Sequence, residues 1–206
     1  MTNNRYFSRI HKYIVGKEIL DVGSLGNSWS TQLDDPNRPF HFLCENGKSC
    51  IGMDIDKDSV QKYRHKGFKL VHGNAQNFRL RKKFDIIHAS DLIEHLENPG
   101  NFLYCSYRHL KSGGFLILTT PNAICIGSIL RPIFVMLGKQ NINAQHTIWF
   151  CPTTIKTLLQ RSKFKIVLIS TYYSDGYSAV YDFLSPELLK SQIIVIAQKK
   201  SEMVNQ

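Results

Sequence analysis

The strongest constraint on this sequence is a series of short apolar runs, each followed by glycine, an acid or a small polar residue. Five such runs occupy residues 18–22, 50–54, 68–72, 84–88 and 114–120. Amphipathic stretches at residues 58–65 and 99–110 lie between them and predict helices. Short apolar strands that alternate with helices are typical of βαβ units. We therefore predict an α/β fold with a parallel sheet covered by helices.

The alternation changes after residue 121. Residues 123–150 read as an insertion, a helix is predicted at 152–161, and strand-like runs follow at 165–172 and 192–197. We expect the last two runs to form an antiparallel hairpin at the sheet edge. The 206 residues contain no repeat or clear linker, which favours one domain over residues 1–206 with the insertion at about 123–150. A long loop is expected at residues 28–48.

The composition excludes several classes of protein. Apolar residues make up 43% of the chain, which argues against a disordered protein. The five cysteines include no Cys-x-x-Cys pair, so a four-sulfur zinc site or a disulfide framework is not expected. The longest apolar stretch, residues 123–137, is interrupted by Arg131 and Pro132 and is too short to span a bilayer. Because the first residues lack the apolar run of a secretion signal, we expect a cytoplasmic protein.

Positive charge is in clear surplus. The chain has 26 lysines and arginines and 16 acids, a formal net charge of +10. This balance is compatible with a phosphate-bearing partner, with an anionic membrane surface, or with a solubilising surface only. Basic clusters at residues 62–66 and 79–83 have no aromatic-interleaved strand beside them, which favours a solvated face over contact with a nucleic acid.

The insertion pairs an apolar stretch with a polar one. Its apolar side chains include Ile129, Ile133, Phe134, Val135 and Leu137. Such a segment suits a lid over a binding site or a peripheral contact with a lipid. A helical apolar stripe more often packs on the core, and this is what we expect for most of these side chains and for Trp149 and Phe150.

Residues with binding chemistry follow three of the predicted strands. Gly23 and Gly26 follow the first, Asp54 ends the second, and Asn74 follows the third. Ligands of an open parallel sheet bind outside the carboxyl ends of the strands, so these residues are expected to converge there. Glycine lets a ligand approach the backbone closely, a carboxylate can accept both hydroxyls of a ribose, and an amide can read an adenine edge. Each signal alone also fits a simple tight turn, but their order predicts a nucleoside-binding site.

Five ordered segments between residues 17 and 199 resemble the motifs of class I S-adenosylmethionine-dependent methyltransferases. They are EILDVGSLG (18–26), IGMDID (51–56), VHGNAQ (71–76), FDIIHASDLIEHL (84–96) and HLKSGGFLILTTPN (109–122). The last two are most similar to the small-molecule branch, which includes ubiquinone-biosynthesis O-methyltransferases and bacterial homologues of polysaccharide or glycolipid pathways. The resemblance implies a Rossmann-like, seven-stranded, mostly parallel sheet with an antiparallel last strand and helices on both faces.

The resemblance also implies S-adenosylmethionine as the cofactor, with its ribose at Asp54 and its adenine beside Asn74. The residues implied to bind it are Asp21, Gly23, Ser24, Gly26, Asp54, Ile55, Asn74, Ala75, Ser90 and Asp91. The first motif departs from the family pattern, because Gly23 and Gly26 are three residues apart and a third glycine is missing. The same departure argues against a nicotinamide cofactor, whose pyrophosphate needs a glycine-rich helix start.

Two histidines are candidates for proton transfer. Methylation of a hydroxyl is helped by a general base that works near neutral pH, a role that suits histidine. The candidates are His95 and His146.

The segment that contains His95 resembles a metal-binding motif. If the turn is helical, Asp91, Glu94 and His95 share one face. They resemble the Glu-x-x-Glu-His of ubiquinone-type O-methyltransferases and small-RNA 3′-end methyltransferases, with Asp91 in place of the first Glu. The resemblance implies Asp91, Glu94, His95 and His146 as candidate ligands of a divalent metal. In the alternative interpretation, Glu94 and His95 only hydrogen-bond the loop and cap a helix.

We therefore predict an enzyme that methylates an oxygen of a small-molecule, lipid-linked or glycan-linked acceptor. The alternatives are an RNA methyltransferase of the metal-assisted 2′-O type, a nicotinamide-dependent oxidoreductase, and a non-catalytic nucleotide-binding module. The ordered motifs argue against the last two. No residue pattern favours a particular oligomeric state.

Overall fold

The computed structural model describes residues 4–26, 33, 38–125, 128–129, 136–138, 145–172 and 190–200. The strands of this part are β1 (Glu18–Val22), β2 (Ser49–Asp54), β3 (Leu70–His72), β4 (Phe84–Ser90), β5 (Leu110–Pro121), β6 (Phe164–Tyr172) and β7 (Gln192–Lys199). Its helices are α1 (Asn4–Ile14), α2 (Pro39–Asn46), α3 (Lys57–His65), the 3₁₀ helix η1 (Ile93–His95), α4 (Pro99–His109) and α6 (Pro152–Arg161).

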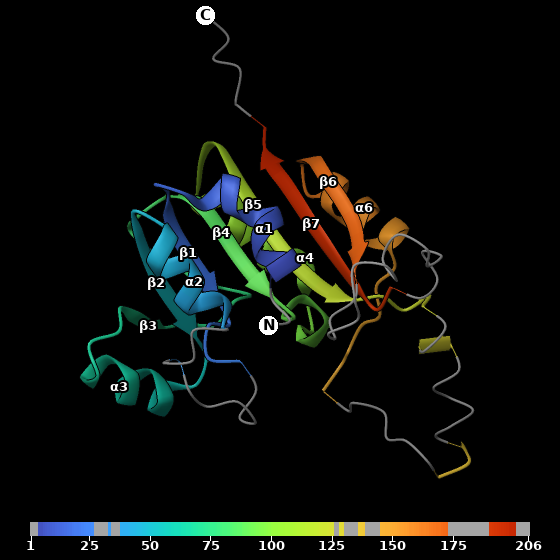
Figure 1. Ribbon diagram of the computed structural model, residues 1–206, viewed down its shortest axis with the longest axis horizontal. Coiled ribbons are helices and arrows are strands. Elements are labelled where there is room, and N and C mark those ends of the chain that lie inside the picture. Colours follow the sequence, from blue (N-terminus) through green and yellow to red (C-terminus); the bar gives the residue numbers. More distant parts are fainter. Residues whose placement is uncertain are drawn as a thin grey trace, which may run out of the picture.

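The seven strands form one sheet in the order β3-β2-β1-β4-β5-β7-β6 (Figure 1). Strands β1 to β5 pair in parallel, and β7 pairs antiparallel with both β5 and β6. The expected mostly parallel sheet with an antiparallel last strand is therefore confirmed. The final hairpin does lie at an edge of the sheet, with β7 inserted between β5 and the edge strand β6.

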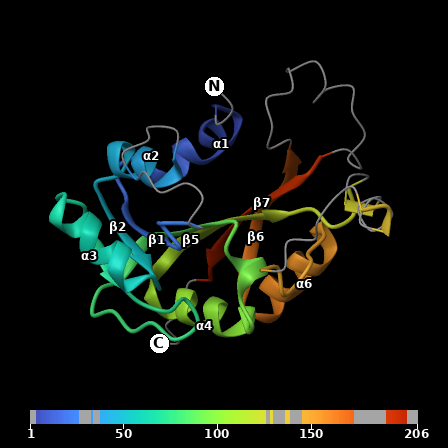
Figure 2. The same cartoon turned by 90° about the horizontal axis from the view of Figure 1, so that it is seen from below.

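Helices cover both faces of the sheet, as predicted. Figure 2 shows α1 and α2 on one face and α4 and α6 on the other. Because successive side chains of a strand point to opposite faces, Ile19 belongs to one buried cluster with Ile10 and Ile14 of α1, whereas Leu20 belongs to a second cluster with Phe102 of α4. The strands are apolar on both sides, which explains why they read as continuous apolar runs.

Two helices lie where the sequence pattern predicts none. The expectation of a loop over residues 28–48 is wrong at residues 39–46, which form α2. Pro39 fits the first turn of this short helix because the amide hydrogen it lacks would have no partner there, and Phe40 and Leu43 are buried. Residues 28–32 and 34–37 of the expected loop lie outside the described residues. Helix α1 is also unpredicted, and it buries Tyr6, Ile10 and Ile14 at intervals of four residues.

The insertion is described only in parts. Ile129 and Leu137 are exposed, so the expectation that they face the core is wrong for these two side chains. Ile133, Phe134 and Val135 lie outside the described residues. Phe150 is buried, as expected, whereas Trp149 is partly exposed and contacts His146. Across the described ranges, no helix combines the length and apolar character needed to cross a membrane.

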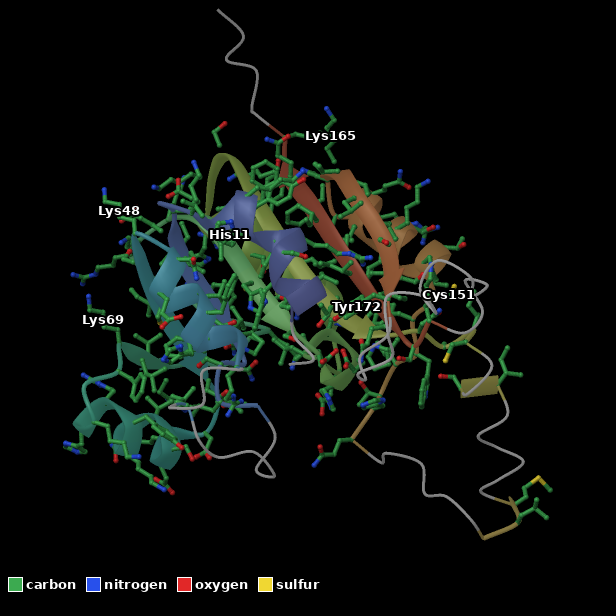
Figure 3. The ribbon with its side chains drawn as sticks, viewed as in Figure 1. His11, Lys48, Lys69, Cys151, Lys165 and Tyr172 are labelled. Carbon is green, nitrogen blue, oxygen red and sulfur yellow. The ribbon has the colours of Figure 1, made fainter. Side chains whose placement is uncertain are left out.

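The parallel strands β1 to β5 all finish on the same side of the sheet, which we call the carboxyl edge. β6 runs parallel to β5, since both pair antiparallel with β7, and Figure 3 places Lys165 and Tyr172 at its opposite ends. Tyr172 therefore lies at the edge where β4 and β5 end. The loops that follow β1, β2, β3 and β4 meet at this same edge, as a parallel sheet requires.

Candidate functional site

A cavity of about 760 Å³ opens at the carboxyl edge of the sheet. Its walls come from the loops after β1 to β4, the start of α2, η1 and the segment that contains His146. Every residue that the sequence predicts for cofactor, metal or proton transfer lines it. These residues are Asp21, Gly23, Ser24, Gly26, Asp54, Ile55, Asn74, Ala75, Ser90, Asp91, Glu94, His95 and His146.

The loop after β1 can approach a ligand closely because of its glycines. Gly23 and Gly26 have φ angles of 75° and 65°, which side chains rarely permit. A Cβ atom at Gly23 would lie 3.1 Å from Cδ1 of Leu92, and one at Gly26 would lie 2.9 Å from Nη2 of Arg38. The amide of Gly23 donates to the carbonyl of Met53 over 2.8 Å, which fixes this loop beside the end of β2.

Asp54 joins the glycine loop to the end of β2. Its Oδ2 accepts from the amide of Leu25 over 3.0 Å, and its Oδ1 accepts from the amide of Asp56 over 3.1 Å. Each oxygen of an ionised carboxylate has a further acceptor site, so the group can also receive the two hydroxyls of a ribose. Burial raises the pKa of Asp54 above its ordinary value.

Asn74 and Ala75 form the wall of the cavity after β3. Oδ1 of Asn74 accepts from the amide of Gln76 over 2.8 Å, which holds this side chain in place. Ala75 is buried beside it. Gly73 has no room for a side chain, because a Cβ atom there would lie 2.7 Å from the sulfur of Met53. The wall thus combines an amide with a small apolar surface, a pairing that suits a flat heterocycle.

Asp91 lies at the end of β4 in an unusual backbone conformation. Its φ angle is 47°, and its amide donates to the carbonyl of Thr119 over 3.2 Å. Its Oδ1 accepts from the hydroxyl of Thr119 over 3.2 Å, and that hydroxyl is also 3.0 Å from Oγ of Ser90. Burial raises the pKa of Asp91. The expectation of a continuous helical turn from Asp91 to His95 therefore fails, because the 3₁₀ helix begins only at Ile93.

Glu94 is the most deeply buried acid of the cavity wall, with 2% of its surface exposed. Oε2 accepts from the hydroxyl of Thr120 over 3.0 Å, while Oε1 has no hydrogen-bond partner among the described residues. Burial, together with the nearby charge of Asp91, raises the pKa of Glu94 to about 8. A buried carboxyl oxygen without a partner is costly, which indicates that a ligand completes this position.

Glu94, His95 and His146 form a cluster of potential metal ligands. One donor atom from each lies within 4.8 Å of the others, and Asp91 is not part of this group. Nδ1 of His95 lies 3.0 Å from the carbonyl oxygen of Gln145, and the two imidazole rings meet edge to face at 4.7 Å. Since a carbonyl only accepts, Nδ1 of His95 is the donor and Nε2 keeps its lone pair.

Hydrogen bonds attach the segment around His146 to η1. The amide and the hydroxyl of Thr147 both donate to the carbonyl of Glu94, over 2.9 and 3.0 Å, and the hydroxyl also lies 2.9 Å from the carbonyl of Leu96. This anchor brings His146 to His95 across some 50 residues of sequence. The two predicted histidines therefore do lie together.

The cavity also contains residues that sequence reasoning missed. Arg38, directly before α2, donates from Nη2 to the carbonyl of Leu25 over 2.8 Å. His88 is fully buried in β4 and lies beside Asp21. A histidine within an apolar strand is a usable signal, because a buried imidazole requires partners. Arg38 carries no comparable signal, since its position depends on an unpredicted helix.

Comparison with known proteins identifies the family. A family model described as a methyltransferase domain matches residues 3–169. The mitochondrial ubiquinone biosynthesis O-methyltransferase of Rattus norvegicus is 30% identical over 134 residues, which cover 60% of this chain and 36% of that protein. The ubiquinone biosynthesis O-methyltransferase of Pelagibacter ubique is 25% identical over 131 residues, 61% of this chain and 49% of that protein. The match thus spans from about a third to half the length of these curated relatives.

Solved structures share the fold over almost the whole chain. An S-adenosylmethionine-dependent methyltransferase from Mesorhizobium loti superposes with a TM-score of 0.65 at 16% identity, covering 96% of this chain and 98% of that one. One from Archaeoglobus fulgidus gives a TM-score of 0.66 at 21% identity, covering 95% and 92%. With a family model that covers most of its residues and a fold that matches, this chain belongs to the S-adenosylmethionine-dependent methyltransferases.

Proposed function

We propose that the protein transfers the methyl group of S-adenosylmethionine to an oxygen atom of a small-molecule, lipid-linked or glycan-linked acceptor. The observation that carries this proposal is the pair of imidazoles, His95 and His146, beside the buried carboxyl of Glu94 in the cavity wall. An oxygen acceptor benefits from a base or a cation at the reacting atom. The distant likeness to ubiquinone biosynthesis O-methyltransferases agrees with it.

The cofactor is proposed to lie along the loops after the first four strands. Asp54 accepts the ribose hydroxyls, Ile55 lies beside it, and Asn74 with Ala75 receives the adenine. The methionine part lies near Asp21 and the glycine loop, with Ser90 and Asp91 on its other side. The residues proposed for the glycine loop are Gly23, Ser24 and Gly26. The volume of the cavity, about 760 Å³, and the presence of all these residues in its lining support this placement.

Methyl transfer requires orientation more than covalent chemistry from the protein. The acceptor oxygen attacks the methyl carbon in line with the carbon–sulfur bond, and the sulfur keeps the bonding electron pair. We assign the acceptor proton to Nε2 of His95, because Nδ1 donates to the carbonyl of Gln145 and this bond orients the ring. His146 lies close enough to take the same role or to hold the acceptor.

A divalent cation fits the same cluster. Oε1 of Glu94 lacks a partner among the described residues, Nε2 of His95 has a lone pair, and the three donor atoms lie within 4.8 Å. Carboxylate and imidazole ligands suit several divalent metals. Glu94, His95 and His146 would hold the ion, with Asp91 outside the set. Such an ion lowers the pKa of a bound hydroxyl, and Nε2 of His95 then serves as its ligand instead of as the base.

Radiolabelled S-adenosylmethionine tests the proposal directly. The purified protein is incubated with three acceptor sets: small phenols and catechols, lipid-linked phenols and glycans in detergent, and RNA with free 2′-hydroxyls. We expect label in a hydroxyl acceptor of the first two sets, and a loss of label with His95→Ala but not with His65→Ala on the exposed end of α3. Label in none of the three sets contradicts the proposed acceptor classes, and label only in RNA replaces them with the 2′-O alternative.

The cation is tested in the same assay. Treatment with a chelator is expected to lower the rate, and added Mg²⁺ or Mn²⁺ is expected to restore it. Glu94→Gln should raise the concentration of metal needed for this recovery. A rate that is unchanged by the chelator removes the cation from the proposal and leaves His95 as the base.

A further inference from the structure

Three buried side chains form a row that links α1 to the cavity. The hydroxyl of Tyr6 in α1 hydrogen-bonds Nε2 of His88 in β4. Nδ1 of the same ring lies 2.5 Å from Oδ1 of Asp21 in β1. Tyr6, His88 and Asp21 are 4%, 0% and 3% exposed, so bulk water does not compete for these bonds. The row begins outside the sheet and ends at the loop where the cofactor is proposed to bind.

One arrangement of hydrogens with a neutral imidazole pairs every group of the row. In it, the phenol of Tyr6 donates to Nε2 of His88, and the ring carries its own hydrogen on Nδ1. That hydrogen is donated to the carboxylate of Asp21. Burial raises the pKa of Tyr6 well above its ordinary value and keeps the phenol as the donor. The single negative charge of the row is therefore placed on Asp21.

Aromatic packing holds the outer end of the row. The ring of Tyr172, labelled in Figure 3 at the end of β6, stacks on the ring of Tyr6 with centroids 6.2 Å apart. The guanidinium of Arg9 lies 5.6 Å from the centroid of the Tyr172 ring. Tyr6 is therefore held by Tyr172, which Arg9 contacts in turn, and this packing limits the freedom of its hydroxyl to leave His88.

The inner end of the row faces the cavity. Asp21 and His88 both line it, next to Gly23. In the part of the chain that the structure describes, no lysine or arginine forms an ion pair with Asp21, and its basic neighbour is His88. A buried carboxylate with only a neutral donor behind it favours a cation on its open side. S-adenosylmethionine and its product S-adenosylhomocysteine both carry an ammonium group on the methionine part.

We propose that His88, oriented by Tyr6, is a positioning residue that fixes the Asp21 carboxylate for the ammonium group of the cofactor. This inference deepens the proposed function and rests on the cofactor-binding role proposed there for Asp21. It makes α1 a part of the cofactor site, although this helix contributes Tyr6 from outside the cavity wall.

The test compares two ligands that differ in the amino-acid part, which carries the ammonium group. S-adenosylhomocysteine has it, whereas 5′-methylthioadenosine shares the adenosine and the thioether but lacks the amino acid. Tyr6→Phe removes one hydroxyl and is expected to weaken the binding of S-adenosylhomocysteine roughly three- to tenfold, the effect of one hydrogen bond. The affinity for 5′-methylthioadenosine should stay unchanged. His88→Leu should have a larger effect of the same kind. His88→Asn keeps an N–H near Nδ1 and should recover part of the affinity.

Tyr13→Phe is the matched control. Tyr13 lies on the same helix, and its ring contacts Phe115 with centroids 5.4 Å apart, away from the row. We expect wild-type affinity for both ligands. A general disturbance of the fold would lower the affinity for both ligands equally. An equal loss of affinity for the two ligands in Tyr6→Phe therefore overturns the inference, and so does an unchanged affinity for both. Thermal unfolding without ligand verifies that each variant is folded.

Asp21→Asn separates this inference from the proposed function. If the wild-type protein binds S-adenosylhomocysteine but Asp21→Asn keeps the wild-type preference over 5′-methylthioadenosine, the role proposed for Asp21 is wrong. If Asp21→Asn loses that preference and Tyr6→Phe keeps it, only the positioning role of the row is wrong. Loss of preference in both variants, with His88→Asn between wild type and His88→Leu, supports the inference.

Discussion

Acidic side chains have different surroundings where the parallel strands begin, the amino edge, and where they finish, the carboxyl edge. At the amino edge, Glu18 lies 2.6 Å from Nζ of Lys82 and 2.7 Å from Nζ of Lys111, which also lies 3.0 Å from Asp85. Hydrogen bonds from Lys111 and Lys82 lower the pKa of Glu18 to about 2. At the carboxyl edge, burial raises the pKa of Asp54, Asp91 and Glu94.

The difference shows where the chain supplies its own counter-charges. Within the described residues, no lysine or arginine forms an ion pair with Asp54 or Glu94, which are both buried. Acids that are buried without a cation are costly, and such groups concentrate at functional sites. The cofactor of this family carries a sulfonium and an ammonium group. We infer that the amino edge serves stability, whereas the acids of the carboxyl edge are completed by bound ligands: the ribose hydroxyls at Asp54 and cations at Asp21 and Glu94.

The largest expected effect that separates the two edges is on catalysis. His95→Ala at the carboxyl edge should lower kcat by about 10²–10⁴-fold, the usual contribution of a proton-transfer group, while the affinity for S-adenosylmethionine stays within a few-fold. Glu18→Gln at the amino edge should leave kcat unchanged. Steady-state kinetics with the acceptor that the radiolabel assay identifies measure kcat for both variants. An equal loss in the two variants would break the comparison.

A smaller effect is expected on the pH dependence of stability. The pKa of Glu94 is about 8 in the folded chain and about 4.3 in an unfolded one, so the folded state binds more protons between these values. The free energy of unfolding without metal should therefore fall as the pH rises from about 4.5 to 8. Glu94→Gln should remove about 1–3 kcal/mol of this fall. Urea unfolding at pH 6 and pH 9 with a chelator measures it, and parallel pH profiles for the two proteins would count against a buried, protonated Glu94.

The smallest effect is expected at the amino edge, with the opposite sign. The folded-state pKa of Glu18 is about 2, below its unfolded value, so its contribution is fully present above pH 4.5 and is lost as the pH falls through 2. Glu18→Gln should destabilise the protein slightly at pH 6 and hardly at all near pH 2, and added salt should reduce the difference. Urea midpoints at the two pH values measure this. A variant that loses more stability at the lower pH would contradict the assignment.

The sheet was predictable because its strands are buried on both faces and therefore appear as continuous apolar runs. Helix α2 was not predictable because it is short and its apolar residues follow no clear helical period, whereas α1 has Tyr6, Ile10 and Ile14 at helical spacing and was overlooked. Phe40 and Leu43 in α2 become informative only once the sheet is there to pack against. Local pattern thus predicts the apolar strands and the helices α3, α4 and α6, whereas tertiary packing determines α2.

The candidate site was predictable where it follows from topology. Asp54 and Asn74 lie in the cavity because parallel strands deliver their carboxyl ends to one edge. The row from Tyr6 to Asp21 was not predictable. Tyr6 and Asp21 lie 82 and 67 residues from His88 in the sequence, and the three residues share no local pattern. Of the four residues predicted as metal ligands, three lie close together, whereas Asp91 lies outside this group. The proposed spacing assumed an α-helix from Asp91, whereas that residue has a positive φ and stands before a 3₁₀ turn.

The affinity of Asp54 variants for S-adenosylmethionine tests the central claim most directly. Asp54→Asn preserves the shape of the side chain and Asp54→Ala removes it, and Glu18→Ala is the matched loss of an acid at the amino edge. By calorimetry we predict that both Asp54 variants bind about 10–100-fold more weakly, as expected for lost hydrogen bonds to a charged group, while Glu18→Ala binds like the wild type. Folded Asp54 variants that bind S-adenosylmethionine with wild-type affinity would contradict the placement of the cofactor at the carboxyl edge.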